Sequence, residues 1–481
     1  MPITSSENIL RVLSAFNPWW STGSIPQHFR KGFKRFAWSE VQKYLHHPDI
    51  RRAVVLTGAR RVGKTTILYQ TVDDLLQKRI DPRRIVFVSL DHPMLKLSNM
   101  SEILDCYRQN IYGDDDVYYL FDEVQYADDW DRWIKTIYDT QGQARIVATG
   151  SASPVLAEKA AESGVGRWVV LKVPTLSFFE YCELLQAKER PVLPPDIRPT
   201  GLAGIDRREM SEVFLKLSGL QKHFHRYLLV GGFPELVLSS DDYLAQQVMR
   251  DDVVDKVLKR DIPSLFNIRN VAELEKIFIY LCLYSSNIIS VDAISKELGG
   301  VSRTTVENYL RYLESANLIY RSDPVELTGK KILKSRSKIY IADAAIRNAI
   351  LMKSDILADP EEMGIMAETA VFKHLASFYY KNLTRVGYYR DGQKGKEIDI
   401  VVDFPGGKIL VEVKYRDDPA IAENDAIKVM ADRAVASIVV TKNENDYDIQ
   451  PLPGGKGLVK IPAYAFLYLL GNAEKHGHQG A

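Results

Sequence analysis

Short apolar runs alternate with stretches of helical periodicity over the first third of the chain. The runs span residues 54–56, 85–90, 117–121 and 144–148, and each is followed by a polar residue. Apolar runs of this length are typical of buried strands, and strands that alternate with helices form a parallel sheet. Polar residues at the carboxyl ends of parallel strands lie at one edge of the sheet. The pattern therefore predicts an α/β domain that carries a site at that edge.

The first apolar run leads into a glycine-rich loop and then into a helix pattern. Gly58 to Thr65 matches G-x-x-x-x-G-K-[ST], the P-loop, whose backbone N–H groups cradle phosphates at a helix N-terminus. A side chain at either glycine would block the phosphates. The alternative is a chance match in a loop, against which the flanking strand and helix patterns argue. The predicted nucleotide-binding residues are Gly58, Arg61, Val62, Gly63, Lys64, Thr65 and Thr66.

Polar residues after the third and fourth runs complete the predicted site. Lys64 is expected to reach the β- and γ-phosphates, and Thr65 with Asp122 to hold Mg²⁺. Glu123 is expected to polarise the attacking water, a role that nucleotide binding alone would not require. Thr149 or Ser151 would sense the loss of the γ-phosphate, or would merely cap the loop. The order of these residues predicts a site that hydrolyses a nucleoside triphosphate with Mg²⁺.

The segment 266–343 has the helix and strand pattern of a winged helix. Its third helix, 302–316, buries one apolar face and leaves Arg303, Thr304, Asn308 and Arg311 exposed, as a DNA-recognition helix does. A basic stretch without acids follows and would form a wing that binds DNA phosphates. Winged helices also serve as packing modules, which is the alternative. The basic residues of the stretch are Lys330, Lys331, Lys334, Arg336 and Lys338.

A second group of ionisable residues is predicted on a hairpin near the C-terminus. Residues 397–402 and 408–414 alternate as two antiparallel strands around Pro405-Gly406-Gly407. Alternation places Glu397 and Asp399 on one face, and Glu412 with Lys414 on one face of the return strand. The preceding helix, 363–379, carries Glu368. The carboxylates and the lysine are expected to converge, unless they form an ordinary solvated ion pair.

Several motifs together resemble a known group of proteins. GARRVGKTT, LFDEVQ, ATGSAS, VGRWVVLKVPTLSFFEY, YLLVGGFPE and RDIPSLFNIRN look like the bacterial and archaeal AAA-type ATPases that carry an uncharacterised C-terminal domain. The resemblance covers about residues 50–414. It implies that Arg167, in the Gly166-Arg167 pair, is an arginine finger or sensor that acts within its own chain or on a neighbour. A surface ion pair is the alternative for Arg167.

The hairpin with its Glu-bearing helix resembles the PD-(D/E)xK nuclease core. This resemblance implies that Asp399 and Glu412 bind a divalent ion that activates water, with Glu368 as an auxiliary ligand and Lys414 as a cationic helper. Folds of this kind are also reused without cleavage, so a non-cleaving scaffold is the alternative.

Composition excludes several classes of protein. The chain has 63 Lys+Arg against 62 Asp+Glu, so overall charge selects no partner, and nucleic-acid contacts would have to come from local patches. Three scattered cysteines argue against a disulfide scaffold or a zinc site. The N-terminus lacks the pattern of a signal peptide, and no apolar stretch is long enough to cross a membrane. We therefore expect a soluble cytoplasmic protein.

The expected organisation begins with a lead-in, residues 1–45. Its aromatic and basic residues, around 17–20 and 29–38, either contact nucleic acid or pack beside the P-loop strand. We favour packing. The later segments are an AAA-type ATPase domain (46–185), a linker and helical segment (186–265), a winged helix (266–343), a nuclease-like α/β domain (344–470) and a disordered tail (471–481).

The predicted function is an ATP-hydrolysing AAA-type ATPase that acts on DNA as a remodeller or motor, in a homo-oligomer or alone and with or without nuclease activity. The alternative is a nucleotide-gated switch that binds a protein or RNA partner and keeps an inactive nuclease-like scaffold.

Overall fold

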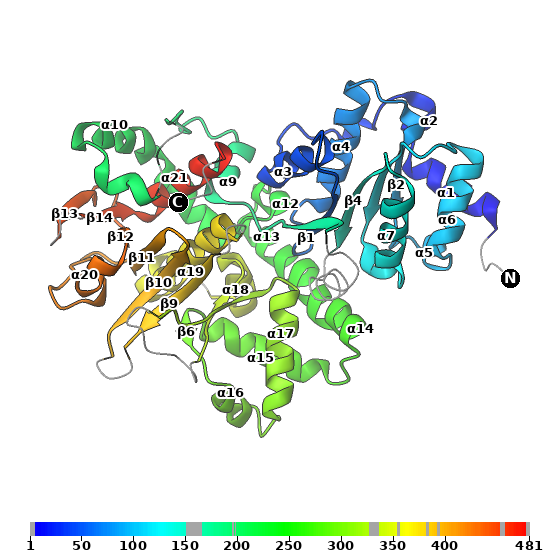
Figure 1. The fold of residues 1–481 in the computed structure, drawn as a ribbon. Coiled ribbons are helices and arrows are strands. Elements are labelled where there is room, and N and C mark those ends of the chain that lie inside the picture. The colour runs from blue at the N-terminus through cyan, green and yellow to red at the C-terminus, as the bar shows by residue number, and fades with distance from the viewer. Residues whose placement is uncertain are drawn as a thin grey trace. The chain divides into compact units, whose positions relative to one another are not determined.

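The computed structural model divides the chain into two compact units, residues 1–174 (unit 1) and 175–481 (unit 2), which are described separately (Figure 1). It describes residues 5–150, 166–194, 197, 199–326, 336–353, 356–380, 384–391, 395–452 and 457–477. The division precedes the boundary expected after residue 185, because α9 (Phe178–Leu184) packs against α21 (Ala463–Lys475) inside unit 2.

The described part of unit 1 forms a parallel five-stranded sheet in the order β2-β3-β4-β1-β5. The expected apolar runs are confirmed as its first strands, and a further edge strand, β5, was not predicted. Only part of β5 is buried, so its sequence lacks the continuous apolar pattern of the others. The strands are β1 (Ala53–Thr57), β2 (Ile85–Ser89), β3 (Tyr118–Asp122), β4 (Arg145–Gly150) and β5 (Trp168–Lys172).

Helices cover both faces of this sheet. α1 (Ser6–Phe16), α6 (Met100–Asn110) and α7 (Trp130–Thr140) share one apolar core with the strands. α3 (Phe36–Leu45) and α4 (Lys64–Gln77) contact the sheet from the opposite face (Figure 1). The short helices α2 (Trp19–Thr22) and α5 (Pro93–Lys96) lie in the connections. The sheet is thus enclosed, and its carboxyl edge is left for polar residues.

The Asn17–Trp20 segment packs against the edge strand β2. The Asn17 side chain donates to the Phe87 carbonyl at 2.8 Å and accepts from the Phe87 N–H, as a neighbouring strand would. Trp19 and Trp20 both donate their indole N–H groups to the Ile85 carbonyl, at 3.0 and 2.9 Å. This supports packing rather than nucleic-acid contact, although the strand covered is β2 and not the P-loop strand.

Unit 2 begins with helices and continues with a small antiparallel sheet in the order β6-β8-β7. The apolar face predicted for the third helix of this region is confirmed, because Val306, Tyr309, Leu310 and Leu313 are all buried on α17. The helices are α10 (Arg207–Leu217), α11 (Gln221–Val230), α12 (Pro234–Val237), α13 (Asp242–Val248) with π-helical turns to Asp261, α14 (Ile262–Phe266), α15 (Val271–Leu283), α16 (Val291–Glu297) and α17 (Arg303–Ser315). The strands are β6 (Asn287–Ile288), β7 (Ile319–Ser322) and β8 (Lys338–Ile341).

The C-terminal part of unit 2 is a mixed sheet whose described strands run in the order β13-β14-β12-β11-β10-β9. The predicted hairpin is confirmed as β10 paired with β11, with Phe404 opposite Gly407. The strands are β9 (Arg385–Arg390), β10 (Glu397–Phe404), β11 (Gly407–Lys414), β12 (Ala436–Thr441), β13 (Asp448–Pro451) and β14 (Gly457–Pro462). The helices are α18 (Ala344–Leu351), α19 (Pro360–Tyr379), α20 (Ala426–Val429) and α21.

The end of the chain differs from the expected disordered tail. α21 continues to Lys475, and Gly471 lies against Phe179, where an added Cβ would come within 2.2 Å of the Phe179 Cβ. The apolar residues of α21 are buried, so the helix is part of the core. The polar residues at the end of the sequence had suggested a disordered tail. Among the residues that the structure describes, no helix is long and apolar enough to cross a membrane.

Candidate functional site

The P-loop in unit 1 is closed around its own lysine. Gly63 precedes α4 with φ of 96°, a left-handed conformation that favours glycine. The Lys64 ammonium donates to the carbonyls of Gly58 at 2.9 Å and Ala59 at 2.8 Å. These carbonyls take the place that phosphate oxygens would take as partners of the lysine. The predicted loop, Gly58 to Thr66, is therefore present as a preformed turn at the N-terminus of α4.

Arg35 supports this loop, although its sequence gave no sign of such a role. The buried guanidinium donates to the carbonyls of Val62 at 2.8 Å and Pro174 at 2.9 Å. It thereby joins the P-loop to the segment that follows β5. A buried arginine with carbonyl partners in two segments can be recognised only from the fold.

Gly58 is the most constrained position of the loop. A Cβ at this residue would lie 2.2 Å from the Val173 carbonyl oxygen, which is backbone and cannot move aside. Overpacking of this kind costs about 1–3 kcal/mol. We therefore expect Gly58→Ala to weaken ATP binding by about 10- to 100-fold, measured by isothermal titration calorimetry.

Gly142 provides the matched control for that substitution. No described atom lies within 4 Å of a Cβ added there. Gly142→Ala should leave the ATP affinity unchanged, and equal affinities of both variants and the wild type would contradict the role of Gly58.

Asp122 joins the P-loop helix to β4. Its carboxylate accepts from the Thr65 hydroxyl at 2.9 Å and from the Thr149 hydroxyl. This is possible because β4 lies between β1 and β3 in the sheet, so Thr149 stands between the two strand ends. Burial, together with the neighbouring Glu123, raises the pKa of Asp122 to about 6. Thr65 and Asp122 offer the oxygen ligands that Mg²⁺ prefers, so the residues fit that ion.

Glu123 follows Asp122 in a left-handed conformation, with φ of 56°. Its N–H donates to the Thr149 hydroxyl at 3.1 Å, and its carboxylate accepts from the Gln125 amide. A non-glycine residue in this conformation costs energy, and such residues can mark functional sites. Glu123 thus lies beside Asp122 and shares Thr149 with it as a hydrogen-bond partner.

The structure does not bring Arg167 to the P-loop within unit 1. The Arg167 carbonyl accepts from Ala53 N–H at 3.0 Å, so the residue lies at the amino edge of the sheet. The P-loop leaves the carboxyl end of β1, about 16 Å away along the strand. The Arg167 side chain instead pairs with Asp139 at 2.8 Å. The surface ion pair is thus what the structure shows; Ser151, the other predicted sensor, lies outside the described residues.

In unit 2 the predicted carboxylates converge on Lys338, which the sequence assigned to the DNA-binding wing. The buried Lys338 ammonium lies 2.8 Å from Glu368, 3.1 Å from Glu397 and 3.2 Å from Asp399. The Tyr340 hydroxyl also donates to Glu368, at 2.8 Å. Burial lowers the pKa of Lys338, but Glu368, Tyr340, Asp399 and Glu397 together outweigh burial, and the pKa lies well above its usual value.

Glu412 and Lys414 complete this cluster. They form an ion pair of 2.7 Å, and the N–H of Val413 between them donates to Asp399 at 2.9 Å. Burial, together with the nearby Asp399 carboxylate, raises the pKa of Glu412 to about 7. The convergence of Glu368, Asp399, Glu412 and Lys414 that the sequence predicted is therefore present.

The expected divalent ion does not fit this arrangement. The Lys338 ammonium, itself a cation, already contacts Glu368 and Asp399. Over the described ranges, no group of three or more His, Cys, Asp or Glu side chains is placed to hold a metal ion. These residues therefore support no metal-dependent step.

The predicted DNA-binding wing needs one correction. Lys338 points into the protein with 3% of its side chain exposed, so it cannot contact phosphates at the surface. Its position at the start of β8 and the carboxylates around it explain the burial. Arg336 is exposed, whereas Lys330, Lys331 and Lys334 lie outside the described residues.

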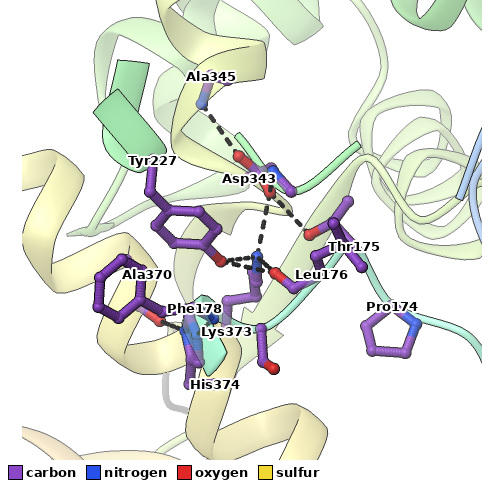
Figure 2. A network of polar contacts seen from close by, with 12 residues as sticks. Pro174, Thr175, Leu176, Phe178, Tyr227, Asp343, Ala345, Ala370, Lys373 and His374 are labelled. Atoms are coloured by element: carbon purple, nitrogen blue, oxygen red, sulfur yellow. Dashed lines mark hydrogen bonds and ion pairs between the residues drawn. The ribbon is translucent and has the colours of Figure 1, made fainter. Parts of the chain in front are cut away.

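A buried polar network in unit 2 includes residues of the motifs VGRWVVLKVPTLSFFEY and YLLVGGFPE. The Lys373 ammonium contacts Asp343 at 3.1 Å, the Leu176 carbonyl at 3.0 Å and the Tyr227 hydroxyl at 2.5 Å. Asp343 also accepts from the Thr175 hydroxyl at 2.7 Å (Figure 2). The residues after β5 and those of YLLVGGFPE thus meet α18 and α19.

Gly232 and His374 also belong to this network. Gly232 lies so near Leu176 that a Cβ would come within 2.5 Å of its carbonyl oxygen, and Gly232 N–H donates to Asp343 at 3.2 Å. Burial keeps the pKa of His374 well below its usual value, so the neutral ring accepts from Phe178 N–H at 2.8 Å. Gly232 therefore packs directly against this network.

Comparisons with known proteins match three family models along the chain. Residues 50–182 match the family model described as an AAA domain. Residues 221–356 and 363–464 match two models described as domains of unknown function, DUF8612 and DUF4143.

Two relatives match most of this chain and most of their own length. An uncharacterized protein of Methanocaldococcus jannaschii is 25% identical over 424 residues, which cover 85% of this chain and 86% of that protein. An uncharacterized protein of Haemophilus influenzae is 24% identical over 413 residues, 84% of this chain and 92% of that protein.

Among solved structures, the chain is similar to the Aeropyrum pernix ORC2 protein with 14% identity and a TM-score of 0.36, covering 71% of this chain and 98% of that one. The Thermotoga maritima RuvB Holliday junction branch migration motor has 16% identity and a TM-score of 0.29, covering 62% of this chain and 94% of that one.

The family match falls on the parallel sheet that carries the P-loop and Asp122. Residues 50–182 thus match an AAA domain and carry the P-loop, and matches to two domains of unknown function follow it.

Proposed function

We propose that this chain hydrolyses ATP with Mg²⁺ and uses the reaction to act on DNA. The observation that carries the proposal is the contact of Thr65 with Asp122 beside Lys64 and Glu123, at one edge of one sheet. Binding alone would need the P-loop and a metal ligand, whereas a carboxylate next to them serves water activation.

Each residue has a separate part in this reaction. Lys64 would exchange the Gly58 and Ala59 carbonyls for phosphate oxygens. Thr65 and Asp122 would hold Mg²⁺, which neutralises charge on the phosphates when it is bound. Glu123 would accept a proton from the attacking water as it approaches the γ-phosphate. Catalysis would come mainly from positioning and charge stabilisation.

The DNA part of the proposal rests on the region from α15 to β8. The order of helices and strands there supports the proposal of a winged helix, and α17 exposes Arg303 and Arg311. The exposed Arg336 precedes β8. Arg303 pairs with Asp292 at 3.1 Å, so part of its charge is compensated. Contacts of these arginines with DNA phosphates would weaken as the salt concentration rises, because each contact releases counterions from the DNA.

The chain passes from unit 1 to unit 2 within the segment 173–178. Val173 N–H donates to Thr57 at 2.6 Å, next to the P-loop, and Arg35 holds Pro174. The next residues, from Thr175 to Phe178, are fixed in the buried network of unit 2.

The test is ATP turnover with and without single-stranded, duplex and branched DNA at low salt. We expect at least one DNA form to raise the rate in the wild type, and Lys64→Ala to reduce turnover to background with every DNA. Strand integrity is scored in the same tubes. Failure of every DNA form to bind would contradict the DNA part and leave the ATPase part standing.

The alternative is a nucleotide-gated switch for a protein or RNA partner with a non-cleaving nuclease-like scaffold. The lysine within the carboxylate cluster favours a non-cleaving scaffold. Slow turnover that is indifferent to DNA, with tight retention of ADP, would support the switch. Assembly into a homo-oligomer, in which Arg167 would leave Asp139 to reach a neighbour's nucleotide, is part of the first proposal.

A further inference from the structure

The carboxylate cluster of unit 2 is built around a cation that belongs to the chain itself. The Lys338 side chain is 3% exposed and lies 2.8–3.2 Å from oxygens of Glu368, Glu397 and Asp399. Those residues come from α19 and β10, while Lys338 comes from β8 of the small antiparallel sheet. A single ammonium thus joins elements that are distant in the sequence.

The three distances from the Lys338 nitrogen indicate that each N–H of the ammonium group has a carboxylate partner. Lys has three N–H donors and no acceptor, and each of its donors has a carboxylate within reach. Contacts of this length between an ammonium and a carboxylate are charge-assisted hydrogen bonds. Charged groups buried in this way are retained in proteins when they are paired, because an unpaired buried charge is very costly.

We propose that Lys338 is a built-in replacement for a divalent ion in a nuclease-like carboxylate cluster. The cluster then serves as a structural centre that fastens β8 to α19 and β10, and DNA is not cut there. This inference concerns unit 2 and is independent of ATP hydrolysis in unit 1. It also explains why a lysine at the end of a basic stretch turns inward.

The remaining residues of the cluster agree with this assignment. Lys414, the expected cationic helper, is paired with Glu412 at 2.7 Å, and Asp399 receives Val413 N–H at its second oxygen. The Tyr340 hydroxyl occupies a further position beside Glu368. Asp399 therefore has a partner at each oxygen, as expected for a structural carboxylate.

The first arm of the test uses the folded wild type and measures Mn²⁺ binding by electron paramagnetic resonance. Nucleotide is omitted so that the P-loop does not bring its own metal. We expect wild type and Asp399→Asn to show the same Mn²⁺ affinity. Binding that is lost in Asp399→Asn, or Mn²⁺-dependent cutting of DNA that is lost with it, would overturn the proposal.

The second arm measures thermal unfolding by circular dichroism. Lys338→Met leaves several buried carboxylates without their cation, and we expect the midpoint to fall by about 5–10 °C. Lys338→Met with Glu368→Gln keeps the net charge of the cluster and should recover part of that loss. The matched control is Lys276→Met, at an exposed position of α15, with an expected shift below about 1 °C.

The stability arm has its own contrary result. An unfolding midpoint for Lys338→Met equal to that of Lys276→Met would overturn the structural role of the lysine. If Lys338→Met does not fold, the double variant and the Mn²⁺ measurement on wild type still decide the proposal.

Discussion

Replacing Glu123 by glutamine is expected to reduce ATP turnover by about 10²- to 10⁴-fold while ATP binding stays near that of the wild type. Glutamine keeps the shape of the side chain but cannot accept a proton from water. The contacts that Lys64 and Thr65 would make to phosphate and Mg²⁺ under the proposed function do not depend on Glu123. Phosphate release reports turnover, and calorimetry with ATP and Mg²⁺ reports affinity.

Glu7 provides a matched control because it is an exposed glutamate of the same unit, in the first turn of α1. Glu7→Gln should leave both turnover and affinity unchanged. A Glu123→Gln variant that hydrolyses ATP at the wild-type rate would remove Glu123 from the mechanism. Loss of binding together with turnover would instead point to a structural role for its left-handed turn.

Replacing Lys373 by methionine is expected to lower the free energy of unfolding by about 3–5 kcal/mol. The substitution keeps the length of the side chain but leaves Asp343 buried without its cation, and it removes hydrogen bonds to Leu176 and Tyr227. Urea unfolding followed by circular dichroism measures the change. The same experiment with Asp343→Asn in addition should show that the two substitutions are not additive.

Unit 1 serves as an internal reference for this experiment. The chain has six tryptophans, and they lie between residues 19 and 168, so tryptophan fluorescence follows unit 1. We expect the fluorescence transition to move less than the circular dichroism transition. Lys276→Met, at an exposed lysine of unit 2, should change the stability by less than about 0.5 kcal/mol. Equal stability of Lys373→Met and Lys276→Met would contradict the role of the network.

Local patterns were sufficient to predict the P-loop and the acidic residues beside it. The P-loop and Asp122-Glu123 each follow a buried strand, and a strand end is a place that sequence spacing alone can mark. The contact between Thr65 and Asp122 then follows from the parallel sheet. Residues such as Arg35 were missed, because its partners, Val62 and Pro174, are remote in the sequence.

The carboxylate cluster shows the opposite balance. Strand alternation correctly brought Asp399 and Glu412 together, and the resemblance suggested a metal. Only the tertiary structure placed Lys338 among the carboxylates, since the lysine arrives on β8, about 60 residues before Asp399 in the chain. In the sequence, the same lysine was the last residue of a basic stretch and indicated DNA.

The sequence by itself determined the strands, the P-loop, the Asp-Glu pair and the apolar faces of the helices, because these depend on neighbours within a few residues. The tertiary structure decided which charged groups are buried together. It fixed Lys338 among carboxylates, Lys373 beside Asp343, and Arg167 at the sheet edge opposite the P-loop. The physical reason is that the partners of a buried charge come from distant segments, and these are set by packing rather than by local pattern.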